Sequence, residues 1–423
     1  MILSKFVRVI PNSAGYILCH TLNRCIVQIK KTDYLDGKLI LNNFSSDEIS
    51  YLKENDFFSN STKTYIEQTK NSARNITTIT INITEHCNFG CTYCYQNDFE
   101  SFNILQKSQI HRIIKYVEYV INQGEKNFYI YFFGGEPLLF KPIIFSIKTE
   151  LDRLISKHNI TILYGIGTNA YFLDIDFVSQ FDKLIVDTTL TLPKDHDKVR
   201  CLKSGKPTFN KILKNITEVS KYSNLVLHIG YNTHHGNIND FEQFLKLLRD
   251  NEIDARIGIY YVNNYDFNKE FSNELSYKDF LKWKSSTAIS LLIKYGFMIH
   301  IFPFTSYKVE CDAYNPWSVK FFADGSLGVC NATHYNKRIL ERSSTNTDAE
   351  YVQKILSPYK NNISKNNNQC LNCSLIGICR GKIYCDNGLC NPMNNVDFDI
   401  FIKEYVEQLN NNNGKYFTFL GTN

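Results

Sequence analysis

Three cysteines lie within eight residues, Cys87, Cys91 and Cys94, in the order C-x3-C-x2-C. Thiolates at this spacing can wrap one face of a cubane iron–sulfur cluster and leave one iron without a protein ligand, open to a small molecule. Zinc sites more often use paired C-x2-C knuckles and four ligands, which this segment lacks. The segment therefore predicts a [4Fe–4S] cluster with an open iron.

The elements around these cysteines follow a repeating pattern. An apolar, β-branched run ends just before Cys87, five more such runs follow, and helical stretches separate them. Near-continuous apolar runs are typical of parallel strands buried on both faces. We therefore predict an α/β fold, a partial (β/α)6 TIM-like barrel, with the cysteine loop at the strand end where such barrels do chemistry. The predicted strands cover 77–83, 128–133, 160–166, 184–190, 225–229 and 256–261. The predicted helices cover 104–123, 141–157, 174–181, 208–221, 239–251 and 277–295.

The segment CNFGCTYC resembles the CxxxCxΦC signature of the radical S-adenosylmethionine (radical SAM) superfamily, with Tyr93 as the aromatic residue. The second predicted strand ends in FFGGEP, which resembles the family's GGEP motif for the amino group of SAM. Two glycines there would let the strand end approach a ligand closely. Thr168-Asn169-Ala170 is similar to the family's TNG turn, with alanine in place of glycine. By this resemblance the SAM-binding residues are Tyr93, Gly134, Gly135, Glu136, Pro137, Thr168, Asn169, Thr189 and Arg200, the last pairing with the SAM carboxylate.

Seven more cysteines follow the predicted barrel and resemble the cysteine-rich SPASM domain, which houses two auxiliary [4Fe–4S] clusters. The resemblance assigns the distal cluster to Cys370, Cys373, Cys379 and Cys390, and the cluster nearer the active site to Cys311, Cys330 and Cys385. Two departures stand out: five residues rather than three separate Cys379 from Cys385, and seven thiols are one short of eight. A zinc ribbon built on Cys370 and Cys373 is the competing reading.

Net charge, the N-terminal segment and the remaining cysteines limit which classes of protein this sequence could belong to. The chain has 423 residues, 13 cysteines and a formal net charge of +5, which is too small a surplus to predict binding to nucleic acid or a membrane surface. The first 20 residues lack the apolar run of a signal peptide, so we expect a cytoplasmic protein whose cysteines bind metal rather than form disulfides. Cys19, Cys25 and Cys201 fit neither cluster and are expected to be buried free thiols.

Four segments are expected along the chain. Residues 1–75 form a small α+β module, a possible leader-peptide recognition element that offers a strand edge to a peptide. Residues 76–299 form the barrel, 300–395 the auxiliary-cluster domain, and 396–423 a C-terminal helix and tail.

The resemblance implies an enzyme with SAM and three [4Fe–4S] clusters, reduced by an external donor such as flavodoxin or ferredoxin. It would generate a 5′-deoxyadenosyl radical and modify a ribosomally synthesised peptide, by a thioether or carbon–carbon crosslink or by epimerisation.

One alternative is an anaerobic sulfatase-maturing type of enzyme, which oxidises Ser or Cys to formylglycine. That group carries an Asp base after the cysteine equivalent to Cys330, where this chain has Asn331. The other alternative is an iron–sulfur electron-transfer or sensing protein, which has no need of the GGEP motif. No catalytic acid or base can be named from the sequence.

Overall fold

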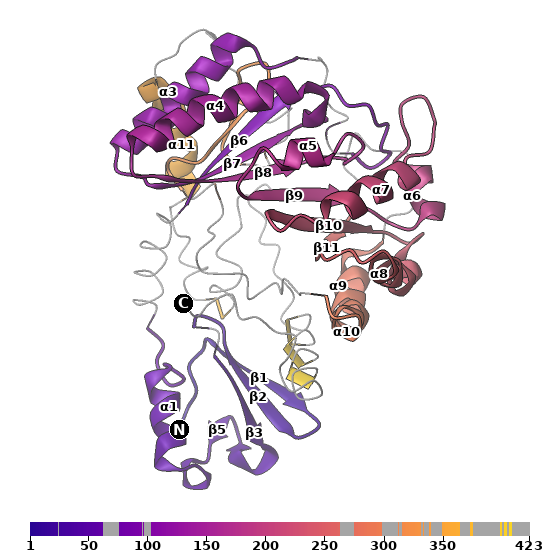
Figure 1. Cartoon of the computed structure of the whole chain (residues 1–423). Coiled ribbons are helices and arrows are strands. Elements are labelled where there is room, and N and C mark those ends of the chain that lie inside the picture. The colour runs from indigo at the N-terminus through magenta and orange to yellow at the C-terminus, as the bar shows by residue number, and fades with distance from the viewer. Residues whose placement is uncertain are drawn as a thin grey trace. The chain divides into compact units, whose positions relative to one another are not determined.

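A computed structural model gives the fold of the chain (Figure 1). The residues it describes are 1–23, 25–61, 76–94, 96, 103–262, 275–297 and 312–363 with gaps at 313–314, 331–332, 334–337 and 340–348, together with 373–374 and six residues between 398 and 407. The chain divides into two compact units, residues 1–72 with 281–307 and 365–423, and residues 73–280 with 308–364. The four-segment division expected from the sequence stays a prediction.

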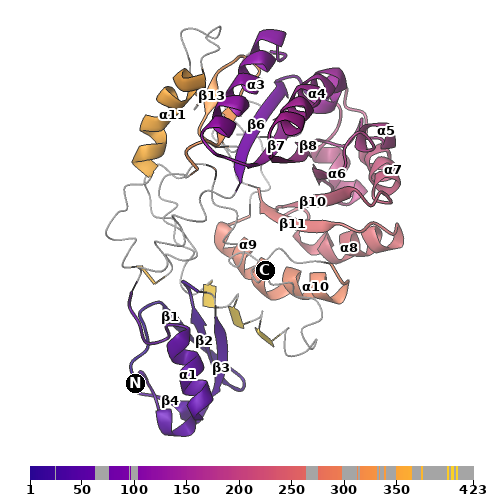
Figure 2. The ribbon, with the colours of Figure 1, turned by 60° about the vertical axis from the view of Figure 1, so that its left-hand side comes forward.

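The larger unit is built on a sheet with six parallel strands in chain order: β6 (Thr77–Thr84), β7 (Asn127–Gly134), β8 (Thr161–Gly167), β9 (Leu184–Thr189), β10 (Leu225–Thr233) and β11 (Arg256–Tyr261). The outer face is covered by α3 (Lys107–Asn122), α4 (Lys141–Lys157), α5 (Ile175–Val178), α7 (Phe209–Val219) and α8 (Phe241–Asp250), as Figures 1 and 2 show. The mixed α/β architecture and the large parallel sheet of a partial barrel are confirmed.

The expected burial on both faces is found along β6 but not along β7. Along β7, Phe128, Ile130 and Phe132 are at most 2% exposed, whereas Tyr129 and Tyr131 between them are only partly buried. Alternate side chains point to opposite faces of a strand, so one face packs under the helices and the other lines the barrel interior. The aromatic composition of this inner face made the runs look apolar on both sides.

Several elements were not predicted. β12 (Val319–Phe321) pairs in parallel with β6, and β13 (Leu327–Gly328) pairs antiparallel with β12, which extends the sheet to eight strands. Helices α6 (Pro193–Val199) and α11 (Ala349–Ile363) were also missed. The expected helix over 277–295 is divided into α9 (Tyr277–Trp283), a π-helical turn η5 (Lys284–Ala288) and α10 (Ile289–Lys294). Short 3-10 turns are η1 (Lys31–Asp33), η2 (Leu41–Asn43), η3 (Pro137–Phe140) and η4 (Ile238–Asp240).

The N-terminal part of the smaller unit confirms the expected α+β elements. Strands β1 (Val7–Asn12), β2 (Gly15–His20) and β3 (Ile26–Lys30) form an antiparallel sheet, followed by the hairpin of β4 (Tyr34–Leu35) and β5 (Lys38–Leu39) and by α1 (Ser46–Glu54). Leu52 of α1 is 1% exposed and packs in a core with residues of the sheet. Ser45 begins the helix with a capping box, in which its side chain accepts from the Glu48 backbone.

The C-terminal helix and tail expected over 396–423 fall largely outside the described residues. Within the described part of the chain, no helix combines the length and hydropathy needed to cross a membrane.

Candidate active site

The cysteine loop follows β6 and is held by the segment that follows α6. The backbone N–H groups of Gly90 and Thr92 donate to the carbonyls of Cys201 and Val199, each over 3.0 Å. Both hydrogen bonds join segments that are more than a hundred residues apart in the sequence. They bring the loop against the stretch that carries Arg200, so the fold joins two motifs that the sequence shows separately.

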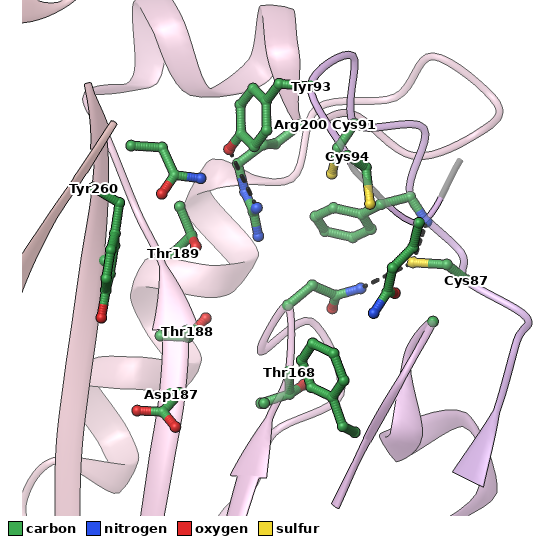
Figure 3. A pocket seen from close by; sticks show the side chains of 18 of the residues that line it. Cys87, Cys91, Tyr93, Cys94, Thr168, Asp187, Thr188, Thr189, Arg200 and Tyr260 are labelled. Atoms are coloured by element: carbon green, nitrogen blue, oxygen red, sulfur yellow. Dashed lines mark hydrogen bonds between the residues drawn. The ribbon is translucent and has the colours of Figure 1, made fainter. Parts of the chain in front are cut away.

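The thiols of Cys87, Cys91 and Cys94 lie at one end of a cavity (Figure 3). Burial raises the pKa of Cys87 to about 11 and that of Cys94 to about 12, so a bound cation is needed to stabilise the thiolates at neutral pH. Among the described residues, no three Cys, His, Asp or Glu side chains converge on one ion.

The two glycines of the GGEP segment are needed for contact between strands. A Cβ on Gly134 would lie 2.2 Å from the carbonyl oxygen of Thr84, and a Cβ on Gly135 would lie 2.2 Å from that of His86. The Gly135 N–H donates to the Thr84 carbonyl over 2.8 Å. This hydrogen bond joins the end of β7 to the exit of β6, the segment 84–86 that leads from β6 to Cys87. Both glycines also line the cavity, and their close approach to a ligand stays a prediction.

Glu136 is fully buried, and its carboxylate joins the ends of two strands. It accepts from the Leu138 backbone over 2.9 Å, from Thr168 Oγ1 over 2.7 Å and from the Asn169 backbone over 2.7 Å. Burial raises the pKa of this carboxyl, and these three donors oppose that effect. Glu136 and Pro137 do not line the cavity, unlike the other seven residues expected to bind SAM. Contact between Glu136 and an ammonium stays a prediction.

The turn after β8 departs from its family pattern at a strained position. Ala170 has φ +62°, in the left-handed region that favours glycine, and it is fully buried. Asn215 Nδ2 donates to the carbonyls of Ala170 and Tyr171 over 2.8 and 2.9 Å, which holds the turn in this conformation. Asn169 in turn donates to Asn88 Oδ1 over 2.8 Å, so the turn is fastened to the cysteine loop.

Arg200 presents a guanidinium beside the cysteine loop (Figure 3). One of its NH groups donates to the Tyr93 hydroxyl over 3.3 Å, and the guanidinium carbon lies 5.8 Å from the centre of the Phe89 ring. Burial acts to lower the pKa of Arg200, but Tyr93 and Cys91 outweigh it and raise the pKa, so the cation persists. Its Nε has no hydrogen-bond partner among the described residues, which leaves a donor for an anionic ligand.

The cavity has a volume of about 460 Å³, within the usual range for small-molecule sites. Thr168, Asn169 and Thr189 lie on its wall as expected. Three further lining residues were not predicted from the sequence: Asp187 on β9, His228 on β10 and Tyr260 on β11. Alternation along each strand could have flagged them, because all three fall on inward-facing positions.

The auxiliary cysteines are only partly described. Cys330 follows β13, and its N–H donates to Thr333 Oγ1 over 3.2 Å, while Cys373 is exposed. Cys311, Cys370, Cys379, Cys385 and Cys390 lie outside the described residues. Of the three thiols outside the cluster patterns, Cys19 is fully buried as expected, whereas Cys25 and Cys201 are only half-buried.

The sequence around this site is similar to that of known proteins. Residues 81–248 match the model of the radical SAM superfamily. A cysteine-type anaerobic sulfatase-maturating enzyme of Clostridium novyi is 29% identical over 35% of this chain and 42% of its own length. The radical SAM cyclopropyl synthase TigE of Paramaledivibacter caminithermalis is 23% identical, with 97% of each chain covered.

Two solved structures share the fold. The anSMEcpe structure with bound AdoMet and a Cp18Cys peptide has a TM-score of 0.61 at 18% identity, covering 79% of this chain and 98% of that one. Streptococcus suis SuiB bound to its precursor peptide SuiA has a TM-score of 0.50 at 14% identity, covering 90% and 94%.

The matched barrel and the cysteine loop define a class of domain: residues 81–248 of this chain form a radical SAM domain. It is related to the sulfatase-maturating enzymes and to the peptide-modifying radical SAM enzymes. SAM and a [4Fe–4S] cluster are the cofactors of this family.

Proposed function

We propose that this radical SAM enzyme modifies a ribosomally synthesised peptide, by a thioether or carbon–carbon crosslink or by epimerisation. The observation that carries the proposal is a cavity with three thiols at one end and ample polar and aromatic wall beyond them. The similarity to TigE, which extends over 97% of both chains, supports it. So does the fold shared with SuiB, a structure that contains a precursor peptide.

The residues present fit the cofactors. Cys87, Cys91 and Cys94 would hold the cluster, and the unpartnered Nε of Arg200 would face the SAM carboxylate. With the cluster and SAM bound, the chemistry supplied at this site would be one-electron cleavage of SAM followed by hydrogen abstraction from the substrate. The chain itself has to orient both partners and exclude water and other hydrogen donors from the cavity. Tyr93, Phe89 and Phe133 supply aromatic wall for that exclusion.

Further parts of the proposal rest on the sequence. Cys330 and Cys373, with the cysteines outside the described residues, would ligate two auxiliary clusters, and flavodoxin or ferredoxin would be the reductant. In the N-terminal module, β3 pairs only with β2 among the described strands, so its other edge would take up a leader peptide. Because thiolate ligands must stay reduced, we place the enzyme in the cytoplasm.

The decisive experiment is anaerobic turnover of the reconstituted enzyme with SAM, a reductant and the peptides encoded beside its gene. Formation of 5′-deoxyadenosine together with a mass change in one peptide would support the proposal. SAM turnover with every neighbouring peptide unchanged would count against peptide modification. Absence of SAM cleavage by fully loaded protein would leave an electron-transfer role instead.

Sulfatase maturation is the second candidate, favoured by the relative from Clostridium novyi and by the fold of anSMEcpe. Asn331, which lies outside the described residues, stands where that group has its Asp base. A cysteine peptide carrying a sulfatase motif separates the two candidates, because a formylglycine product would favour this one.

A further inference from the structure

A carboxylate lies inside the cavity, away from the cysteine loop. Asp187 and Arg200 both line the cavity, and among its described lining residues they carry the one carboxylate and the one guanidinium. Arg200 lies beside the cysteines, whereas Asp187 lies lower on its strand (Figure 3). Asp187 precedes Thr189 by two residues on β9, which at ~3.3 Å per residue places it about 7 Å deeper in the barrel.

His228 holds this carboxylate in position. Its Nδ1 lies 2.8 Å from Asp187 Oδ1, and the two residues are register partners on neighbouring strands β9 and β10. Because a carboxylate oxygen only accepts, the ring proton of this contact is on Nδ1. Within the described part of the chain, the other oxygen, Oδ2, accepts no hydrogen bond, and the Asp187 side chain is 37% exposed. One oxygen is thus anchored, and the other faces the cavity.

Aromatic rings flank the carboxylate on both sides, and glycines on neighbouring strands make room for them. Gly167 is the register partner of Asp187, and a Cβ there would meet the Tyr131 hydroxyl at 2.5 Å and the Phe133 ring at 2.7 Å. On the other side, a Cβ on Gly258 would meet the Tyr260 ring at 2.7 Å. All three rings line the cavity, and Tyr260 is 57% exposed.

Two cationic side chains lie near these residues. Lys320 Nζ lies 5.3 Å from the centre of the Phe133 ring and donates to the Thr333 carbonyl over 2.9 Å. Arg256 follows His228 in register on β11 but is not among the residues that line the cavity. Tyr260 lies on β11, the next strand but one from the β9 strand of Asp187, and both residues line the same cavity. A carboxylate between aromatic faces is an arrangement that recognises cations, through an ion pair and through the faces of the rings.

We propose that Asp187, positioned by His228 and flanked by Tyr131, Phe133 and Tyr260, binds a basic side chain, lysine or arginine, of the peptide substrate. This inference rests on the proposed function of peptide modification. The methylene stem of such a side chain would pack along the rings while its charged end reaches Oδ2. Asp187 is therefore a specificity-determining residue of the cavity.

Selection from a display library of short random peptides tests the proposal. The bait is the anaerobically reconstituted holoenzyme with SAM, as wild type, as Asp187→Asn and as Asp176→Asn, a control that changes an exposed carboxyl on α5. We expect Lys or Arg to be enriched at one position by wild type and by the control, and not by Asp187→Asn. A selected peptide should bind Asp187→Asn about tenfold or more weakly than wild type. Replacing its basic residue by norleucine should abolish that difference.

The other outcomes separate the two hypotheses. Peptides selected without a basic preference, or with the same preference on Asp187→Asn, would overturn this inference alone. Failure of any bait to select peptides would count against the proposed function as a whole. SAM affinity and unfolding midpoints are measured for each variant. If Asp187→Asn weakened SAM binding as much as peptide binding, the carboxylate would belong to the SAM subsite and the inference would fall.

Discussion

Replacing Gly135 by alanine should disturb the cluster site through the backbone. The added Cβ would lie 2.2 Å from the His86 carbonyl oxygen, whereas ordinary contacts begin at 3.4 Å. The exit of β6 would therefore have to move by about 1 Å, one residue before Cys87. The displacement opposes two backbone hydrogen bonds of 2.8 Å, from Gly135 to Thr84 and from Glu136 to His86.

The size of the effect follows from these contacts. Overpacking of this kind costs about 1–3 kcal/mol in free energy of unfolding, and each weakened hydrogen bond contributes about 1 kcal/mol. Because Cys87 moves with the strand exit, we also expect fewer iron atoms per chain after anaerobic reconstitution and weaker SAM binding. Iron analysis, isothermal titration with SAM and urea unfolding measure the three effects.

Gly90→Ala is the matched control. Gly90 lies inside the cysteine loop, but a Cβ there would have its nearest contact at 3.8 Å, with Lys203. This variant should keep its iron, its SAM affinity and its stability. The reasoning would be refuted if Gly135→Ala matched Gly90→Ala in all three measurements, because the strand exit would then tolerate the clash.

Three further predictions concern single residues. Cys91→Ser should lose the part of the iron–sulfur absorbance that comes from one cluster, whereas Cys201→Ser, a nearby thiol outside the C-x3-C-x2-C pattern, should keep all of it. Equal loss in both variants would contradict the ligand assignment. Burial, and then Arg200, lower the pKa of the fully buried His196 from 6.5 to about 3. The unfolded chain therefore binds a proton that the folded chain excludes, and stability should fall by about 1.4 kcal/mol per pH unit below about pH 6.5. His196→Leu should flatten that slope in urea unfolding, and an unchanged slope would refute the assignment. Ser45→Ala removes the capping box of α1 and should cost about 1 kcal/mol in unfolding free energy, which Ser45→Asp should largely restore.

Much of the barrel could be predicted because its signals are local. Apolar runs of the right length marked all six parallel strands, and α4 has the expected bounds, 141–157. β12 was missed because three residues carry too weak a pattern, and it is a strand only because β6 offers it a partner. The splitting of the expected 277–295 helix by η5 likewise has no signal in its apolar spacing.

The sequence by itself indicated the chemistry expected of the cysteine loop, because three thiols that could wrap one face of a cubane lie within eight residues. It also marked the segments that are expected to bind SAM. The tertiary structure decided what those motifs do: the GGEP glycines meet the exit of β6, and the Glu136 carboxylate joins two strand ends. It alone placed Asp187 beside His228, since partners 41 residues apart become neighbours only through the register of parallel strands.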